Sequence, residues 1–489
     1  MNLFKVKSPY FFIFSLIILV ELLSFTAYFL PQLQIYLLIT AFLAVFFLSL
    51  SSLESGLLVA LAELVIGSKG HLFSASIFGV SVSLRLVIWL ALMLASCIFI
   101  FRRGFPTVWR TKLFNFSYWP WVSVLAAFII LAFVHGYLRG NSASDIFTDG
   151  NAWFYLGLLL PTILAYSQID DKQEQRLRAV FFTAIFWLSL KTLMLLFIFS
   201  HNISIMPDVY LWIRRSGVGE ITAMGGGWYR IFIQSQIYIP IAFFLLLWPS
   251  LDLKTKKNPY LLIISLAVLL SVIIISMSRS FWLAFAFTAG VMAVISFRKK
   301  ISLYLKALVY TGAALGLSLL LILVVVKFPY PNPQAGLSAA ALSARLDFSS
   351  GEAAISSRWS LLPNLWQSIN DSLFWGKGFG ASVSYFSQDP RVLSLNPSGW
   401  YTTYAFEWAY LDTWLKLGLF GLIAYFAWLI VLIVDLLKKM REHGKMLPAA
   451  ILAGLIFLMV VNIFTPYLNH PLGFGFLIFS SCFIKKNPL

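Results

Sequence analysis

Cysteine and charge are both scarce in this 489-residue chain. Its two cysteines, Cys97 and Cys482, lie in apolar runs, so the composition excludes a disulfide-stapled secreted scaffold. Only 11% of the residues are charged, whereas about 25% is usual for a soluble domain. With 60% hydrophobic residues, 46 of them phenylalanine, the chain is neither disordered nor an ordinary soluble enzyme.

Metal-binding and nucleotide-binding motifs are missing as well. The five histidines are scattered, with no HxxxH or HExxH spacing, so we expect no metal site and no cofactor. Gly376, Gly378 and Gly380 fall in LFWGKGFG, but no GK[ST] follows and no βαβ pattern surrounds them. We therefore interpret these glycines as a tight turn.

Long apolar runs dominate the rest of the chain. A bilayer core of roughly 30 Å requires about 20 apolar residues per helix, and the clear spans are 10–30, 33–51, 84–101, 119–138, 152–167, 177–199, 229–249, 260–278, 280–297, 303–326, 409–436, 447–466 and 472–484. The shorter stretch 53–67 carries two glutamates, and counting it gives fourteen crossings. The sequence predicts an all-α polytopic integral membrane protein with about 14 transmembrane helices.

The net charge of +17 fits membrane topology better than a nucleic-acid partner, which we do not expect. Basic loops are retained on the cytoplasmic side of a membrane. With fourteen spans and a cytoplasmic N-terminus, 21 of the 36 Lys and Arg residues fall in short cytoplasmic segments. These segments contain Lys5, Lys7, 102–112, 170–178, 252–258, 298–300, 438–445, Lys485 and Lys486. Omitting 53–67 would place the N-terminal lysines outside, so we expect both termini in the cytoplasm. The N-terminus shows no cleavable signal pattern, and we expect its first apolar stretch to be retained.

Two predicted outer loops, roughly 200–228 and 327–408, are long, and long loops are usually functional. In the second loop, apolar residues recur at the i, i+3, i+4, i+7 spacing of an amphipathic helix. They are Trp359, Leu362, Leu365, Trp366 and Ile369.

Arginines on the predicted outer side run against the usual charge distribution. Arg214, Arg215 and Arg230 flank the first loop, Arg279 lies at the apex between two spans, and Arg358 begins the amphipathic helix. For one arginine alone, snorkelling or a structural ion pair is the simpler interpretation. Several guanidinium groups in one pocket would instead bind a lipid diphosphate without a metal, because each is a planar bidentate donor.

Carboxylates near the large loop allow two interpretations. Glu407 has no basic partner at i+3 or i+4. It could take a proton from an acceptor hydroxyl, or it could stabilise a helix N-terminus. Asp412 and Lys416 are spaced i, i+4 and should pair with each other.

Acids within the N-terminal spans support another function class. Glu21, Glu54 and Glu63 lie in apolar stretches, where ionisable residues often form proton relays. They favour a transporter, for instance a flippase of lipid-linked oligosaccharide. Such carriers commonly show inverted repeats, and we find no internal repeat.

Several motifs resemble the O-antigen ligase and O-antigen polymerase superfamily. They are SMSRSFWLAF, LFWGKGFG and YLDTWLKLGLFGLIAYF, and the resemblance covers about 260–440. It implies a metal-independent membrane glycosyltransferase that acts on undecaprenyl-diphosphate-linked glycans at the outer face of the bacterial inner membrane. The implied partners are this donor, a glycan or lipid-linked acceptor, membrane lipids, and a chain-length regulator or flippase.

The resemblance also implies roles for individual residues. Arg279 matches the family's hairpin arginine, Arg358 the arginine that opens the loop helix, and the three glycines its glycine turn. Arg230 resembles the arginine after the earlier outer loop, with Arg215 as a competing match. All four arginines would bind the diphosphate, and Arg279 would also act in catalysis.

The family's ligases commonly carry a histidine in a His-Asn-x-aromatic-Leu pattern, where this chain has Glu-Trp-Ala-Tyr-Leu from Glu407. This departure favours a polymerase, or another capsule or exopolysaccharide enzyme, with Glu407 as the catalytic base.

We expect three parts in the chain. They are N-terminal transmembrane helices in 1–250, a ligase-like core in 260–440 that includes the outer loop 327–408, and a C-terminal hairpin in 446–489.

Overall fold

The computed structural model describes residues 9–77, 80–108, 113, 116–166, 169–224, 228–251, 258–295, 301–331, 353–443 and 446–483. Several residues of the predicted cytoplasmic segments lie outside these ranges. They are Lys5, Lys7, 109–112, 252–257, 298–300, 444–445, Lys485 and Lys486.

Helices form most of the described chain. The first half contains α1 (Pro9–Phe29), α2 (Gln32–Ser51), α3 (Leu53–Ile66), α4 (Leu84–Arg103), α5 (Phe105–Val108), α6 (Trp119–Leu138), α7 (Ala143–Gly150), the 3-10 helix η2 (Asn151–Leu158), α8 (Leu159–Tyr166), α9 (Asp171–Ser200), α10 (Met206–Arg215), the 3-10 helix η3 (Gln234–Ile237) and α11 (Tyr238–Ser250). The second half contains α12 (Pro259–Ile275), α13 (Arg279–Ile295), α14 (Ile301–Val326), α16 (Ala353–Asn370), α17 (Pro390–Leu395), α18 (Ala409–His443), α19 (Met446–Val461) and α20 (Pro471–Phe483).

Seven described helices are long and apolar enough to cross a membrane: α1, α2, α4, α6, α9, α14 and α18 over Ala409–Arg441. Shorter apolar helices are α12, α13, α19 and α20 over Pro471–Ser481. A helix satisfies its backbone hydrogen bonds internally, which is what a chain without water around it requires. The predicted all-α polytopic membrane protein is confirmed at this level, and the count of fourteen spans stays a prediction.

Three two-stranded antiparallel hairpins interrupt the helices. They are β1 (Ser74–Ile77) with β2 (Val80–Ser83), β3 (Gly219–Ala223) with β4 (Tyr229–Ile233), and β5 (Val383–Phe386) with β6 (Trp400–Thr403). The predicted span 229–249 is therefore wrong over its first residues, which form β4 and η3 before α11 begins. Ile231 and Ile233 are buried on alternate positions of β4, the period of a strand with one buried face. The predicted span 152–167 likewise begins as a 3-10 helix, η2.

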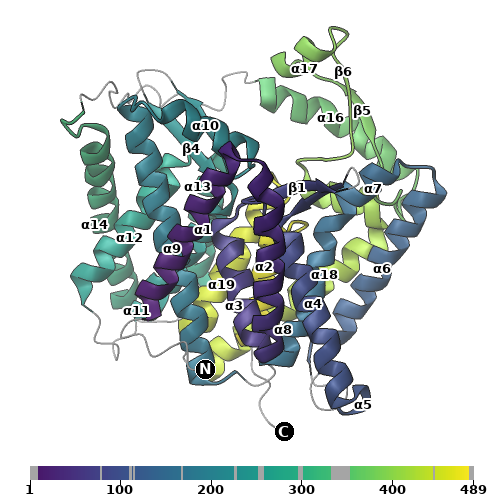
Figure 1. The fold of residues 1–489 in the computed structure, drawn as a ribbon, viewed down its shortest axis with the longest axis horizontal. Coiled ribbons are helices and arrows are strands. Elements are labelled where there is room, and N and C mark those ends of the chain that lie inside the picture. Colours follow the sequence, from purple (N-terminus) through teal and green to yellow (C-terminus); the bar gives the residue numbers. More distant parts are fainter. Residues whose placement is uncertain are drawn as a thin grey trace.

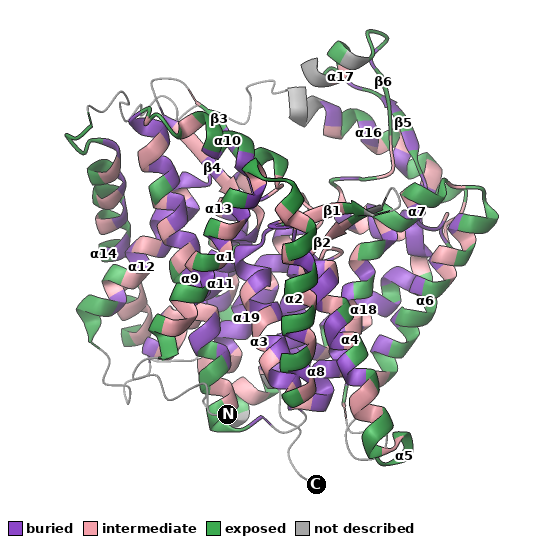
Figure 2. Cartoon of the chain, viewed as in Figure 1, coloured by how far each residue is buried: buried purple, intermediate pink, exposed green. Residues whose placement is uncertain are grey.

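The hairpins gather towards one end of the helix bundle, together with α7, α10 and α16 (Figure 1). We call this the hairpin end. At the opposite end lies α5, directly after Arg102 and Arg103 in the last turn of α4. Along peripheral helices many apolar side chains are exposed, such as Ile130 on α6 and Leu308 on α14, whereas the central helices are largely buried (Figure 2). This distribution is typical of a bundle surrounded by lipid.

The C-terminal helices pack inside the bundle. α19 packs against α11 and α13, and α20 packs against η2 and α8. The predicted C-terminal hairpin thus contacts helices of both other predicted parts, whose boundaries stay a prediction.

Candidate functional site

The β3–β4 hairpin brings Arg230 to the apex between α12 and α13. Arg230 lies opposite Thr222, and its guanidinium carbon is 4.8 Å from the centroid of the Phe232 ring. Its Nε donates a hydrogen bond of 3.0 Å to the Ser276 carbonyl oxygen. Ser276 caps α12, three residues before Arg279 begins α13. Two of the predicted diphosphate-binding arginines therefore belong to adjoining elements.

This apex contains a strained residue. Met277 has a φ of 46°, which is uncommon for a residue other than glycine. It is buried, and its sulfur accepts a hydrogen bond of 3.1 Å from the Trp228 indole just before β4. Strained backbone persists where the surroundings impose it, and it concentrates at functional sites.

Two more non-glycine residues in the described chain have positive φ, Ser68 at 53° and Asn202 at 47°. Asn202 lies between α9 and α10, and the Ser68 hydroxyl accepts a hydrogen bond from the Gln234 amide, directly after β4. All three strained residues therefore lie next to the elements that lead into or out of the β3–β4 hairpin.

Arg214 and Arg215 end α10, whose buried face holds Trp212 and Ile213. The Trp212 indole donates a hydrogen bond of 3.2 Å to the Ser24 hydroxyl on α1. The Arg215 guanidinium lies 5.9 Å from the centroid of the Tyr28 ring. This arginine thus contacts α1 at the hairpin end.

Arg358 and Glu407 form an ion pair with each other. The Arg358 Nε contacts the Glu407 Oε2, and the side chains are 39% and 53% exposed. Glu407 therefore has a partner 49 positions away in the sequence, which its i+3 and i+4 neighbours could not reveal. The helix α16, which carries Arg358, lies apart from α10 and β4 across the hairpin end in Figure 1. The meeting of all four arginines in one pocket stays a prediction.

The predicted amphipathic helix forms as α16, but its buried face is rotated from the predicted one. Leu361, Leu365 and Ile369 are buried in a small core of their own, which also contains Val383 of β5 and Phe406. The predicted face also included two tryptophans that are exposed, and their rings pack edge-on against tryptophans near the start of α18. These pairs are Trp359 with Trp408 and Trp366 with Trp414.

The predicted glycine turn is bound tightly into the bundle. Gly376, Gly378 and Gly380 have φ values of 72°, 81° and 75°, which glycine adopts without steric cost. A Cβ on Gly378 would lie 2.1 Å from the Gly136 amide nitrogen, and one on Gly376 would lie 2.5 Å from that of Gly418. Gly418 itself breaks α18 with a φ of 75°. Only glycine permits these close backbone approaches.

A buried ionic network joins this turn to the helices. Lys416 lies 2.5 Å from both the predicted partner Asp412 and from Asp149 on α7. Asp149 also accepts a hydrogen bond of 2.9 Å from the Gly380 amide, and Asp412 accepts one of 2.8 Å from the Asn469 side chain. The predicted pair is confirmed, whereas its two additional partners are too distant in sequence to have been found from spacing.

Comparison with known families finds a match over part of the chain. Residues 264–426 match the O-antigen ligase family model. Among curated proteins, no sequence matches the chain. The match supports the resemblance to the O-antigen ligase and polymerase superfamily, and it implies a glycosyl-transfer enzyme that handles lipid-linked glycans. Together with the apolar helices, it indicates a multi-pass protein of the bacterial inner membrane.

The O-antigen ligase match covers only part of the candidate site. It contains Arg279, Arg358, the glycine turn and Glu407. Arg230 and Arg215 lie outside it, so the hydrogen bond from Arg230 to Ser276 connects a matched element to an unmatched one.

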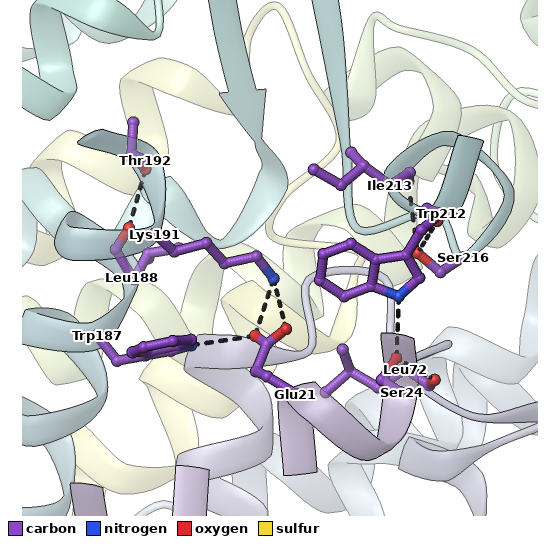
Figure 3. A network of polar contacts seen from close by, with 10 residues as sticks. All are labelled: Glu21, Ser24, Leu72, Trp187, Leu188, Lys191, Thr192, Trp212, Ile213 and Ser216. Atoms are coloured by element: carbon purple, nitrogen blue, oxygen red, sulfur yellow. Dashed lines mark hydrogen bonds and ion pairs between the residues drawn. The ribbon is translucent and has the colours of Figure 1, made fainter. Parts of the chain in front are cut away.

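Each acid in the N-terminal spans has a cationic partner. Glu21 lies 2.8 Å from Lys191 on α9, and it also accepts a hydrogen bond from the Trp187 indole (Figure 3). The other pairs are Glu63 with Arg85, at 2.9 Å, and Glu54 with Arg176, at 3.2 Å. All three pairs join two helices, and the pairs of Glu21 and Glu63 are buried on both sides. Within the described ranges, no group of three or more His, Cys, Asp or Glu side chains could hold a metal ion.

Proposed function

We propose that this protein transfers or polymerises glycans from a polyprenyl-diphosphate carrier, with its hairpin end at the outer face of the inner membrane and both termini in the cytoplasm. An acceptor hydroxyl attacks the anomeric carbon of the donor sugar, the bond from that carbon to the phosphate oxygen breaks, and the diphosphate leaves. The hydrogen bond from Arg230 to the apex that precedes Arg279 is the observation that carries this proposal.

Arginines lower the barrier to this reaction by neutralising the leaving diphosphate, whose charge develops as the bond breaks. Arg230 and Arg279 bind its oxygens from adjoining elements, and Arg215 adds a third guanidinium from the end of α10. Arg279 also contributes directly to catalysis, because it lies at a strained apex whose position is fixed. Guanidinium groups can provide this stabilisation without a metal.

Glu407 accepts the proton of the acceptor hydroxyl in this proposal. Its ion pair with Arg358 must open first, and phosphate oxygens compete with a carboxylate for the same guanidinium donors. Donor binding to Arg358 would therefore release Glu407 when it is needed. The glutamate in place of the ligases' histidine favours a polymerase, which would work beside a flippase and a chain-length regulator.

The direct test is to incubate the purified full-length protein with an undecaprenyl-diphosphate oligosaccharide, without divalent metal, and to separate the products on a gel. A ladder of products would support a polymerase, and a single shifted acceptor would support a ligase. An unchanged donor would overturn the proposal. Movement of that donor across the bilayer of a proteoliposome would then support the flippase alternative.

A further inference from the structure

The turn at 67–70, between α3 and β1, is strained and tightly packed. Ser68 is fully buried and has a positive φ of 53°, and Gly70 has a φ of 92°. A Cβ on Gly70 would lie 2.7 Å from the Cβ of Arg85 on α4. As at the apex beside Arg279, such a backbone conformation persists because its surroundings impose it.

Three hydrogen bonds fix this turn between α4 and the β3–β4 hairpin. The Ser68 carbonyl oxygen accepts one of 2.8 Å from the Arg85 side chain, and the Gly70 carbonyl oxygen accepts one of 3.3 Å from the Arg85 amide. The Ser68 hydroxyl accepts the third, of 3.2 Å, from the Gln234 amide. Because Gln234 directly follows β4, the turn is attached to the strand that carries Arg230.

Lys69 is the exposed residue of this otherwise buried turn. Its side chain passes Gly217, where a Cβ would lie 3.3 Å from the Lys69 Cδ. Gly217 follows the end of α10, whose last turn already holds Arg214 and Arg215. Within the part of the chain that the structure describes, Lys69 forms no ion pair.

A third cation at this place needs an explanation. Two arginines already complement the dipole at the end of α10. Arg214 lies 3.9 Å from Glu220, and Arg215 contacts the Tyr28 ring. The positive field also reaches two histidines outside the helices. Burial, followed by the charges of Arg85 and Lys69, lowers the pKa of His71, and the same causes, with His71 added, lower the pKa of His470 to about 3. Because Arg85 is already paired with Glu63, Lys69 is the charge at this turn that is left for an anion.

We propose that Lys69 is a further phosphate-binding residue of the candidate site, with its ammonium group on an oxygen of the diphosphate that Arg230 binds. This inference rests on the proposed function. Gln234, which anchors the turn, is four residues from Arg230, or about 13 Å along the strand. In this proposal the two long, flexible side chains reach the diphosphate from the two ends of β4.

Binding of undecaprenyl diphosphate to the full-length protein in lipid nanodiscs tests the inference, with the Kd measured by native mass spectrometry. Lys69→Gln should raise the Kd about tenfold, the loss expected for one charged hydrogen bond. Lys69→Arg, which keeps the charge, should restore most of the affinity. The matched control is Lys327→Gln. Lys327 is an exposed lysine at the same end, since the next residue, Phe328, accepts a hydrogen bond from His201 after α9. Its substitution should leave the Kd unchanged.

Arg230→Gln separates the two proposals. If Arg230→Gln weakens binding while Lys69→Gln binds as the unmodified protein does, the role of Lys69 is refuted and the proposed function stands. A Lys69→Gln variant that melts at a lower temperature with an unchanged Kd also refutes it, because Lys69 would then only stabilise the end of α10. If the unmodified protein does not bind the probe, both proposals fail.

Discussion

The two polar regions of the hairpin end are built differently. Around the β3–β4 hairpin, Ile221 and Ile231 are buried, and the strained residues Asn202 and Met277 lie before α10 and between α12 and α13. Arg230 donates a hydrogen bond to the carbonyl oxygen of Ser276, at the end of α12. The region of α16 and β5–β6 has a small separate core, exposed tryptophans and an exposed ion pair. Rigid donors suit a diphosphate of fixed geometry, whereas an exposed aromatic surface suits sugars of varied shape.

The largest effect should come from the buried network beside the glycine turn. Lys416→Met leaves Asp149 and Asp412 buried without a cation, so the free energy of unfolding should fall by about 3–5 kcal/mol. Lys377→Met is the matched control, because its partner Asp371 is 61% exposed, and the expected loss is under about 1 kcal/mol. Denaturant unfolding in detergent measures both, and equal losses would contradict the assignment of a buried network.

Removing a rigid arginine should reduce turnover more than stability. Arg279→Ala should lower glycan transfer by roughly 10²- to 10³-fold, the range for one lost donor to developing negative charge. The gel assay measures this effect, with Arg102→Ala at the opposite end as the control. A folded Arg279→Ala variant that keeps near-normal turnover would remove Arg279 from the site.

The glycine turn allows a test of close packing alone. Gly378→Ala places a Cβ 2.1 Å from the Gly136 nitrogen at a φ of 81°, so we expect a loss of about 1–3 kcal/mol in stability. An added Cβ on Gly312 of α14 would meet no atom within 4 Å beyond the adjacent backbone of its own helix, and Gly312→Ala should be neutral or stabilising by about 0.5–1 kcal/mol. Thermal melting of both variants measures the two changes in stability. An unchanged melting temperature for Gly378→Ala would show that the backbone of the turn can shift to accommodate the added Cβ.

The smallest expected change concerns the exposed ion pair. Because both side chains are well exposed, Arg358→Gln should change the free energy of unfolding by under about 1 kcal/mol. The same unfolding assay measures it, with Glu407→Gln as the reciprocal variant. A loss as large as that of Lys416→Met would mean that this pair is structural and that the contrast between the two regions is wrong.

Hydropathy was sufficient to place many helices but not the local structure at their ends. The predicted stretch 119–138 coincides with α6, and 303–326 lies within α14. Apolar content alone could not separate Tyr229–Ile233 from the span that follows, because a short apolar run has the same pattern in a buried strand as in a buried helix. Tyr229–Ile233 forms a strand because it pairs with β3, and the composition of the segment does not reveal that partner.

Residue spacing could not predict ion pairs between residues that are far apart in the sequence. Lys416 and Asp149 are 267 positions apart. The glycine turn is hydrogen-bonded to both, since the Gly380 amide donates to Asp149 and the Gly378 amide donates to the Lys416 carbonyl oxygen. Local patterns did reveal the Asp412 and Lys416 pair and the glycine turn, since both depend on neighbours in sequence. Lys69 gave no signal of its own, because a lone lysine after a span is common.

The tightly packed glycine turn fixes the position of the C-terminal end of α16. Residues 376–380 are fastened between α6, α7 and the break in α18, so this segment cannot act as a hinge. Arg358 lies twelve residues from Asn370 at the anchored end of α16, or about 18 Å along the axis. A tilt of roughly 10° would therefore move Arg358 by about 3 Å. Phe406 and Trp408, on either side of Glu407, pack against α16, and the Trp408 indole donates a hydrogen bond to the Arg358 carbonyl oxygen. Glu407 therefore moves with the helix, and the ion pair opens by rotation of the two side chains.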